Sequence, residues 1–205
     1  MTLAIYDYVC LVITALTAIY LIYRFFQYKP EGYLCYSLSF LVLLVAGLLI
    51  VLTGSFSVLA YKWVKVVATI IPFSLALGLI KQYFKNLFIL WLIILLAGLI
   101  LIGLNTYEVI GGKIWYPLFH AFAGLTIFFI PILVVSKGEE KGSFLFVTLG
   151  GTLIGLGGIA LAFLSIGSQF LFFSAEFVFA ILTPLLMLMT LSYTWGFVKA
   201  LKNNN

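Results

Sequence analysis

Charged side chains are scarce in this sequence. Only 8% of its 205 residues are Asp, Glu, Lys or Arg, whereas a soluble domain carries about a quarter. A chain of this composition has too little polar surface to fold in water, which excludes nucleic-acid binding and soluble catalysis as primary functions. Hydrophobic residues make up 65% of the chain, and the mean hydropathy is +1.27. The composition therefore predicts an integral membrane protein.

The residues that build most metal and catalytic sites are also rare. His120 is the one histidine, so the chain cannot supply both axial ligands of a bis-histidine haem. Cys10 and Cys35 lie in apolar stretches without CxxC or Cys/His spacing, and we expect them to be packing residues. The HExxH, GxSxG and Walker lysine motifs are missing. These absences favour a protein with no catalytic residues and no metal site of its own.

Seven apolar runs take up nearly the whole chain. Each is long enough to cross a hydrocarbon core of about 30 Å, which takes about 20 helical residues. The sequence therefore predicts one all-α transmembrane domain over residues 1–205, a polytopic seven-helix bundle whose short breaks make neighbouring helices antiparallel. Residues 1–5 lack the basic region of a secretory signal, so the first run is expected to be retained. The predicted spans are 5–26, 33–53, 58–80, 86–106, 115–136, 143–166 and 170–197.

The basic residues predict the orientation of the bundle. With seven spans, the loops after spans one, three and five share a side with the C-terminus, and this side holds eight of the eleven basic residues. The other side has Lys62, Lys65 and Lys113. By the positive-inside rule the N-terminus lies outside and the C-terminus in the cytoplasm. We expect a prokaryotic-type plasma membrane.

Ionisable side chains within the spans are candidates for a site, because they are costly in a bilayer and usually face the bundle interior or water. Glu176 is about seven residues into the last span, on the order of 10 Å below its outer end. One interpretation is an outward-opening polar pocket for a quinone headgroup or a small polar solute. The alternative is that the lysines extend to the headgroups and the histidine bonds a backbone carbonyl. The pocket candidates are Glu176, His120, Lys62, Lys65, Trp115 and Tyr116.

Glycines mark the sixth predicted span. Gly151 and Gly155 form a GxxxG pair, and Gly158 follows one turn later. Small residues at this spacing allow close approach of a second helix, either within the bundle or from a partner chain. On the cytoplasmic side, the SKGEEKGS segment at 136–143 is expected to be a solvated turn in which acidic and basic side chains pair.

Two functional interpretations remain open. FHAFAG at 119–124 and SYTWG at 192–196 resemble fragments of the third subunit of haem-copper oxidases, although that family's other histidines are missing here. The resemblance implies a non-catalytic membrane subunit of a respiratory or other redox complex, with haem carried by partner subunits. The size and the outward pocket are similar to the vitamin-binding components of energy-coupling importers, which normally have six spans. This second resemblance implies a small-solute transporter or substrate-binding membrane component.

Overall fold

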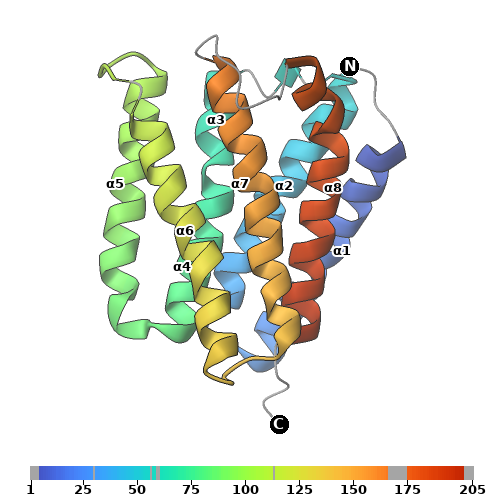
Figure 1. The fold of residues 1–205 in the computed structure, drawn as a ribbon, viewed down its shortest axis with the longest axis vertical. Helices are drawn as coiled ribbons and strands as arrows, with labels where there is room; N and C mark the ends of the chain where they lie inside the picture. The colour runs from blue at the N-terminus through green and yellow to red at the C-terminus, as the bar shows by residue number, and fades with distance from the viewer. Residues whose placement is uncertain are drawn as a thin grey trace.

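The computed structural model describes residues 5–29, 31–55, 57–58, 61–112, 114–165 and 175–200. The side chains of 157–180, 182–183 and 200 are outside the described part. Every regular element in the described ranges is helical, and the long helices run up and down side by side (Figure 1). The prediction of an all-α protein is therefore confirmed.

Eight α-helices and two 3-10 turns make up the described chain. Two ends of the bundle serve as landmarks. The Lys62 end is where α3, α6 and α8 begin, and the Tyr83 end is where α1, α4, α6 and α8 end (Figure 1). The elements are α1 Ile5–Tyr28, α2 Tyr33–Thr53, α3 Lys62–Ala68, α4 Ile70–Tyr83, η2 Lys85–Leu87, α5 Phe88–Thr106, α6 Trp115–Ser136, η3 Gly142–Phe144, α7 Leu145–Ser165 and α8 Ala175–Ala200.

Five helical segments of the described chain are long and apolar enough to cross a membrane. They are Ile5–Tyr28, Tyr33–Thr53, Lys62–Tyr83, Lys85–Thr106 and Trp115–Ser136. Large apolar side chains also cover the outer surface; for example, Leu52 is 80% exposed and Ile100 is 62% exposed. An apolar exterior of this kind is stable in lipid and would aggregate in water. The chain is suited to a membrane, as predicted.

The third predicted span, 58–80, differs most from the structure. Its helix begins at Lys62 and is divided into α3 and α4 at Thr69. Pro72 explains the division, because it has no N–H to donate to the carbonyl of Ala68. The helix also continues past Lys81 to Tyr83, where the sequence predicted a loop. A 3-10 turn over Lys85–Leu87 is enough to reverse the chain there.

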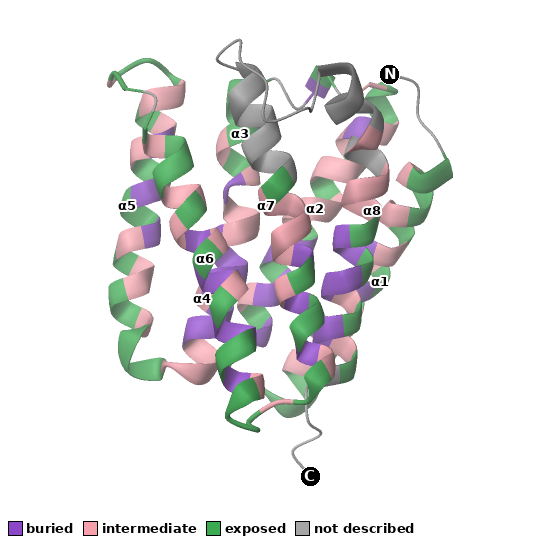
Figure 2. Ribbon diagram, in the orientation of Figure 1, coloured by how far each residue is buried: buried purple, intermediate pink, exposed green. Residues whose placement is uncertain are grey.

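The core contains several fully buried aromatic rings. Tyr36, Phe144 and Phe197 each have 0% exposure. The ring of Phe197 lies 4.4 Å from Tyr36 and 6.1 Å from Phe144, measured between ring centroids. Figure 2 shows that buried positions gather between the helices, mainly in the half of the bundle nearer the Tyr83 end. Aromatic burial therefore joins α2, η3 and α8 at this end.

Glycines allow α7 to pack closely, although not all at the predicted positions. A Cβ added to Gly150 would lie 2.8 Å from the ring of Tyr193 on α8, and one on Gly151 would lie 3.0 Å from Ile127 on α6. A Cβ on Gly155 meets no described atom within 4 Å. The surroundings of Gly158 are outside the described residues. Among the described residues, Gly150 and Gly151 lie at close helix contacts, and close packing at Gly155 and Gly158 stays a prediction.

Candidate functional site

Lys62, a predicted pocket residue, lies in an ion pair on the surface. Its Nζ donates to Oε1 of Glu108 over 2.6 Å, and the two side chains are 51% and 79% exposed. Glu108 is in the turn after α5, which the sequence interpretation did not connect with α3. The hydrogen bond and the positive charge of Lys62 lower the pKa of the Glu108 carboxyl below its usual value. The structure thus places Lys62 in a surface ion pair, and its part in a polar pocket stays a prediction.

Two further candidates lie at the surface of the Lys62 end. Lys65, one turn after Lys62, is exposed. The indole Nε1 of Trp115 donates to the carbonyl of Gly111 over 3.0 Å, so the loop before α6 satisfies its one polar atom. These two residues contribute to the helix ends, and neither points into a described cavity.

Tyr116 and His120 do come together. Their rings stack one turn apart on α6, with centroids 5.4 Å apart and an interplanar angle of 15°. Tyr116 is 43% exposed and His120 is half-buried. The Nδ1 atom of His120 is buried and has no hydrogen-bond partner among the described residues. Glu176 is in the first turn of α8, but its side chain is outside the described part, so its pairing with His120 or a lysine stays a prediction.

A polar network lies at the opposite, Tyr83 end of the bundle. The hydroxyl of Tyr36 donates to Oε1 of Gln82 over 3.1 Å, and Nε2 of Gln82 donates to the hydroxyl of Tyr83 over 2.9 Å. The hydroxyl of Tyr83 in turn donates to Oε1 of Glu140 over 2.8 Å. These four residues, the Tyr83 network, connect α2, α4 and the loop between α6 and α7.

Two glycines create the space for this network. A Cβ on Gly78 would lie 2.5 Å from Cε1 of Tyr36. A Cβ on Gly32 would lie 2.6 Å from the carbonyl oxygen of Gly78 and 2.9 Å from Oε1 of Gln82. Any side chain at either position would separate α2 from α4 and break the hydrogen bond between Tyr36 and Gln82. The close approach of these helices therefore depends on glycine.

Arg24, near the end of α1, is held among tyrosines at the same end. Its guanidinium is hydrogen-bonded to the side chain of Tyr33. It also lies 4.4 Å from the ring centroid of Tyr28 and 6.0 Å from that of Tyr20. These distances allow cation–π attraction, so a positive charge is held beside the Tyr83 network.

The Tyr83 network extends from the buried core to the loop between α6 and α7. At the end of the network nearer the core, the ring of Phe197 packs against Tyr36. At the other end, Glu140 lies in the loop between α6 and α7. No group of three or more His, Cys, Asp or Glu side chains in the described chain could hold a metal ion. The sequence did not predict the network, because it indicates a short break between two spans at 81–85 and a solvated turn at 136–143. The sequence features that could have indicated the network are Gly32 and Gly78, which allow close packing of two helices, and the polar pair Gln82 and Tyr83 at the end of a span.

No family model, curated protein or solved structure matches this chain. Its function has to be inferred from the contacts themselves, and these differ between the two ends of the bundle. At the Tyr83 end the side chains of the network hydrogen-bond to one another, and the Lys62 end has an exposed ion pair and the buried Nδ1 of His120.

Proposed function

We propose that this chain is a non-catalytic integral membrane subunit that packs against other membrane chains in a larger, respiratory or redox, assembly. The Tyr83 network is the observation that supports this proposal best. The four side chains of the network hydrogen-bond to one another, and the ring of Phe197 packs against Tyr36 at the end nearer the core. A polar interior used in this way stabilises the packing of helices and leaves the chemistry to cofactors on partner subunits, such as haem, or to quinone bound between chains.

The proposal includes seven spans with the Tyr83 end in the cytoplasm. The start of α1 at the Lys62 end and the end of α8 at the Tyr83 end support an odd number of crossings (Figure 1). Described basic residues also favour this orientation: Arg24, Lys81, Lys85 and Lys137 are at the Tyr83 end. By the positive-inside rule, that end lies on the cytoplasmic side. The proposed membrane is the plasma membrane of a prokaryotic-type cell.

Purification of the tagged chain in mild detergent tests the subunit proposal. Partner chains in fixed stoichiometry, with haem absorption in the co-purified fraction, are expected. An unrelated polytopic membrane protein carrying the same tag in the same cells is the control for non-specific association. A homogeneous lone chain that keeps its stability without any partner would contradict the proposal.

His120 favours a second candidate function, a substrate-binding or solute-transporting membrane component. Its buried Nδ1 and the stacked ring of Tyr116 could contact a small polar molecule or a quinone headgroup at the Lys62 end. Mass spectrometry of molecules extracted from the purified chain tests this function. Retention by the wild type and loss in His120→Phe, with retention in the distant Trp195→Phe control, is expected. Equal retention in His120→Phe would rule out this site.

A further inference from the structure

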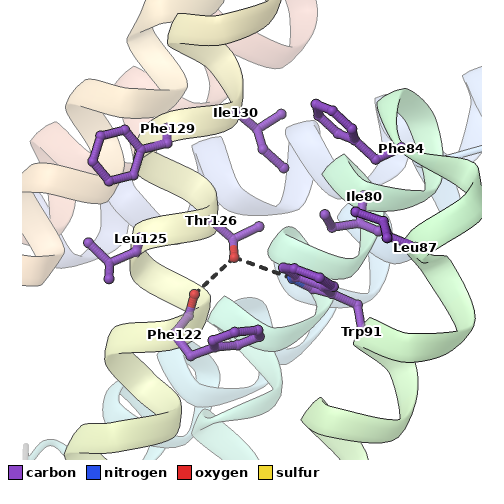
Figure 3. A pocket seen from close by; sticks show the side chains of 9 residues that line it. All are labelled: Ile80, Phe84, Leu87, Trp91, Phe122, Leu125, Thr126, Phe129 and Ile130. Carbon is purple, nitrogen blue, oxygen red and sulfur yellow. Dashed lines mark hydrogen bonds between the residues drawn. The ribbon is translucent and has the colours of Figure 1, made fainter.

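An apolar groove runs along the outside of the bundle between α4, η2, α5 and α6 (Figure 3). Its volume is about 360 Å³. Buried Ile80, Thr126 and Ile130 are part of its floor, and the rings of Trp91 and Phe122 stand at its sides. Nothing in the Tyr83 network or the His120 region takes part in this groove.

The polar atoms in the groove are already satisfied. The hydroxyl of Thr126 donates to the carbonyl of Phe122 over 2.9 Å and accepts the indole N–H of Trp91 over 3.4 Å (Figure 3). A polar ligand would therefore find no free partner on these side chains. Hydrocarbon suits the groove better, because it loses no hydrogen bond on leaving the bilayer core.

The groove opens toward the lipid. Leu125 and Phe129, on the outer face of α6, are 56% and 51% exposed, and Leu87 on η2 is 39% exposed. Because these residues belong to apolar helical segments of membrane-spanning length, the surface they share faces acyl chains. A chain from the surrounding bilayer can enter the groove from the side without crossing a polar barrier.

Two lysines stand near the Tyr83 end of the groove. Nζ of Lys137 lies 5.7 Å from the ring centroid of Phe84, a residue of the groove wall. Nζ of Lys81 lies 5.0 Å from the ring centroid of Phe88, the residue after Leu87. Neither lysine forms an ion pair within the described part of the chain, whereas the neighbouring Lys85 is paired with Glu31 over 2.7 Å.

We propose that this groove binds one anionic phospholipid of the surrounding bilayer. An acyl chain occupies the apolar groove, and the phosphate lies between Lys81 and Lys137. Charge complementarity supports this occupant, because the apolar groove has Lys137 at its wall residue Phe84 and Lys81 next along the chain to its lining residue Ile80, and neither lysine has an anionic partner among the described residues. The ring contact with Phe84 holds the Lys137 ammonium at the groove wall, which favours a bound lipid over one attracted only by net charge.

Native mass spectrometry of the full chain tests the charge contribution. The protein is released from micelles that contain equal amounts of phosphatidylglycerol and phosphatidylcholine. The wild type is expected to retain one phosphatidylglycerol preferentially. Lys81→Gln and Lys137→Gln should each lower that preference about fivefold, because a lysine near an anionic lipid contributes about 1 kcal/mol. The double variant Lys62→Gln/Lys65→Gln removes two positive charges at the opposite end, one more than either single variant, and should leave the preference unchanged.

A second pair of variants tests the groove itself. Leu125→Trp should fill the groove and reduce retention of both lipids. Leu118→Trp is the matched control, because Leu118 is on the same helix two turns earlier and is 49% exposed, but it does not line the groove. Equal retention of the two lipids by the wild type, or the same loss in the Lys62/Lys65 double variant, would overturn the proposal. Thermal unfolding of each variant shows that it is folded, and the lysine variants alone decide if Leu125→Trp does not fold.

Discussion

Tyr83 holds the Tyr83 network together because its hydroxyl has two partners. It accepts the amide N–H of Gln82 and donates to the carboxylate of Glu140. A single oxygen atom thus joins the last turn of α4 to the loop between α6 and α7. Removing one partner of a buried hydrogen bond costs more than the bond contributes, because the remaining group stays desolvated.

Tyr83→Phe should therefore destabilise the protein. The variant keeps the ring, which lies 5.8 Å from that of Phe144, and removes only the hydroxyl. We expect a loss of about 1 to 3 kcal/mol in the free energy of unfolding, measured by denaturant titration in detergent. Tyr107→Phe is the control, because Tyr107 is 54% exposed and should give no change. Equal stability of the two variants would show that the network contributes nothing to folding.

The ion pair between Lys62 and Glu108 should give a pH-dependent signal with little effect on stability. Because the pKa of Glu108 is lowered in the folded protein, the stabilisation from the ion pair is fully present above the ordinary carboxyl pKa. It is lost as the pH falls through the lowered pKa and Glu108 becomes protonated. Carbon-detected NMR titration should place the Glu108 midpoint below that of a free glutamate. Lys62→Met should restore the ordinary value. Because the pair is exposed, the melting temperature should hardly change when the pH is lowered. A large fall in the melting temperature of the wild type that Lys62→Met does not share would contradict this.

At the scale of elements, hydropathy predicts the helices well where the bilayer alone determines their length. The predicted spans 33–53 and 115–136 coincide with α2 and α6, and 86–106 differs from α5 by two residues at its start. The end of α4 could not be predicted in this way. Gln82 and Tyr83 look like loop residues because they are polar, and only contacts with distant α2 and Glu140 explain why they remain helical.

The candidate site was less predictable than the helices, for a geometric reason. Sequence position indicates how deep a residue lies along its helix, but it does not indicate the rotation of that helix or its neighbours. Lys62 was assigned to the correct end, yet its partner is Glu108 from an adjacent loop. The stack of Tyr116 on His120 could have been predicted from the sequence, since residues four apart share a helix face.

Gly78 sets the distance between α2 and α4. Substitution of this glycine by alanine should therefore change the free energy of unfolding differently from the same substitution at a glycine with open space around it. Gly78→Ala should destabilise the protein by about 1 to 3 kcal/mol, because the added Cβ overlaps the buried Tyr36 ring. Gly124→Ala on α6 meets no described atom within 4 Å and should be neutral or stabilising by about 0.5 to 1 kcal/mol. Unfolding titrations of both variants measure the difference. A stabilised Gly78→Ala would show that α2 and α4 are farther apart than described.

On the scale of the whole molecule, charge distinguishes the two ends more than shape does. Antiparallel helices meet at both ends, for example α5 and α6 at the Lys62 end and α6 and α7 at the Tyr83 end (Figure 1). The Tyr83 end holds Arg24 among tyrosines, and the ammonium groups of Lys81 and Lys137 lie over the rings of Phe88 and Phe84. Each end pairs one lysine with a glutamate, Lys62 with Glu108 and Lys85 with Glu31, but more of the described Lys and Arg residues lie at the Tyr83 end. This asymmetry is what a membrane insertion machinery reads as orientation.

Accessibility of single cysteines tests the proposed orientation. Val109→Cys places a thiol in the loop after α5, where the native residue is 68% exposed, and Glu139→Cys places one in the exposed loop after α6. Each is made with both native cysteines replaced by serine. A membrane-impermeant maleimide should label Val109→Cys in intact cells and Glu139→Cys only after permeabilisation. The reverse pattern would invert the orientation, and labelling of both in intact cells would exclude an odd number of crossings between them.

The attachment of Glu140 to Tyr83 also matters for imaging this protein. A membrane chain with such short loops offers electron microscopy almost no mass outside the detergent belt. A rigid marker domain spliced between Gly138 and Glu139 would be held on one side by α6 and on the other by the hydrogen bond from Tyr83. Such a marker would keep a fixed orientation relative to the helices and allow particles to be aligned.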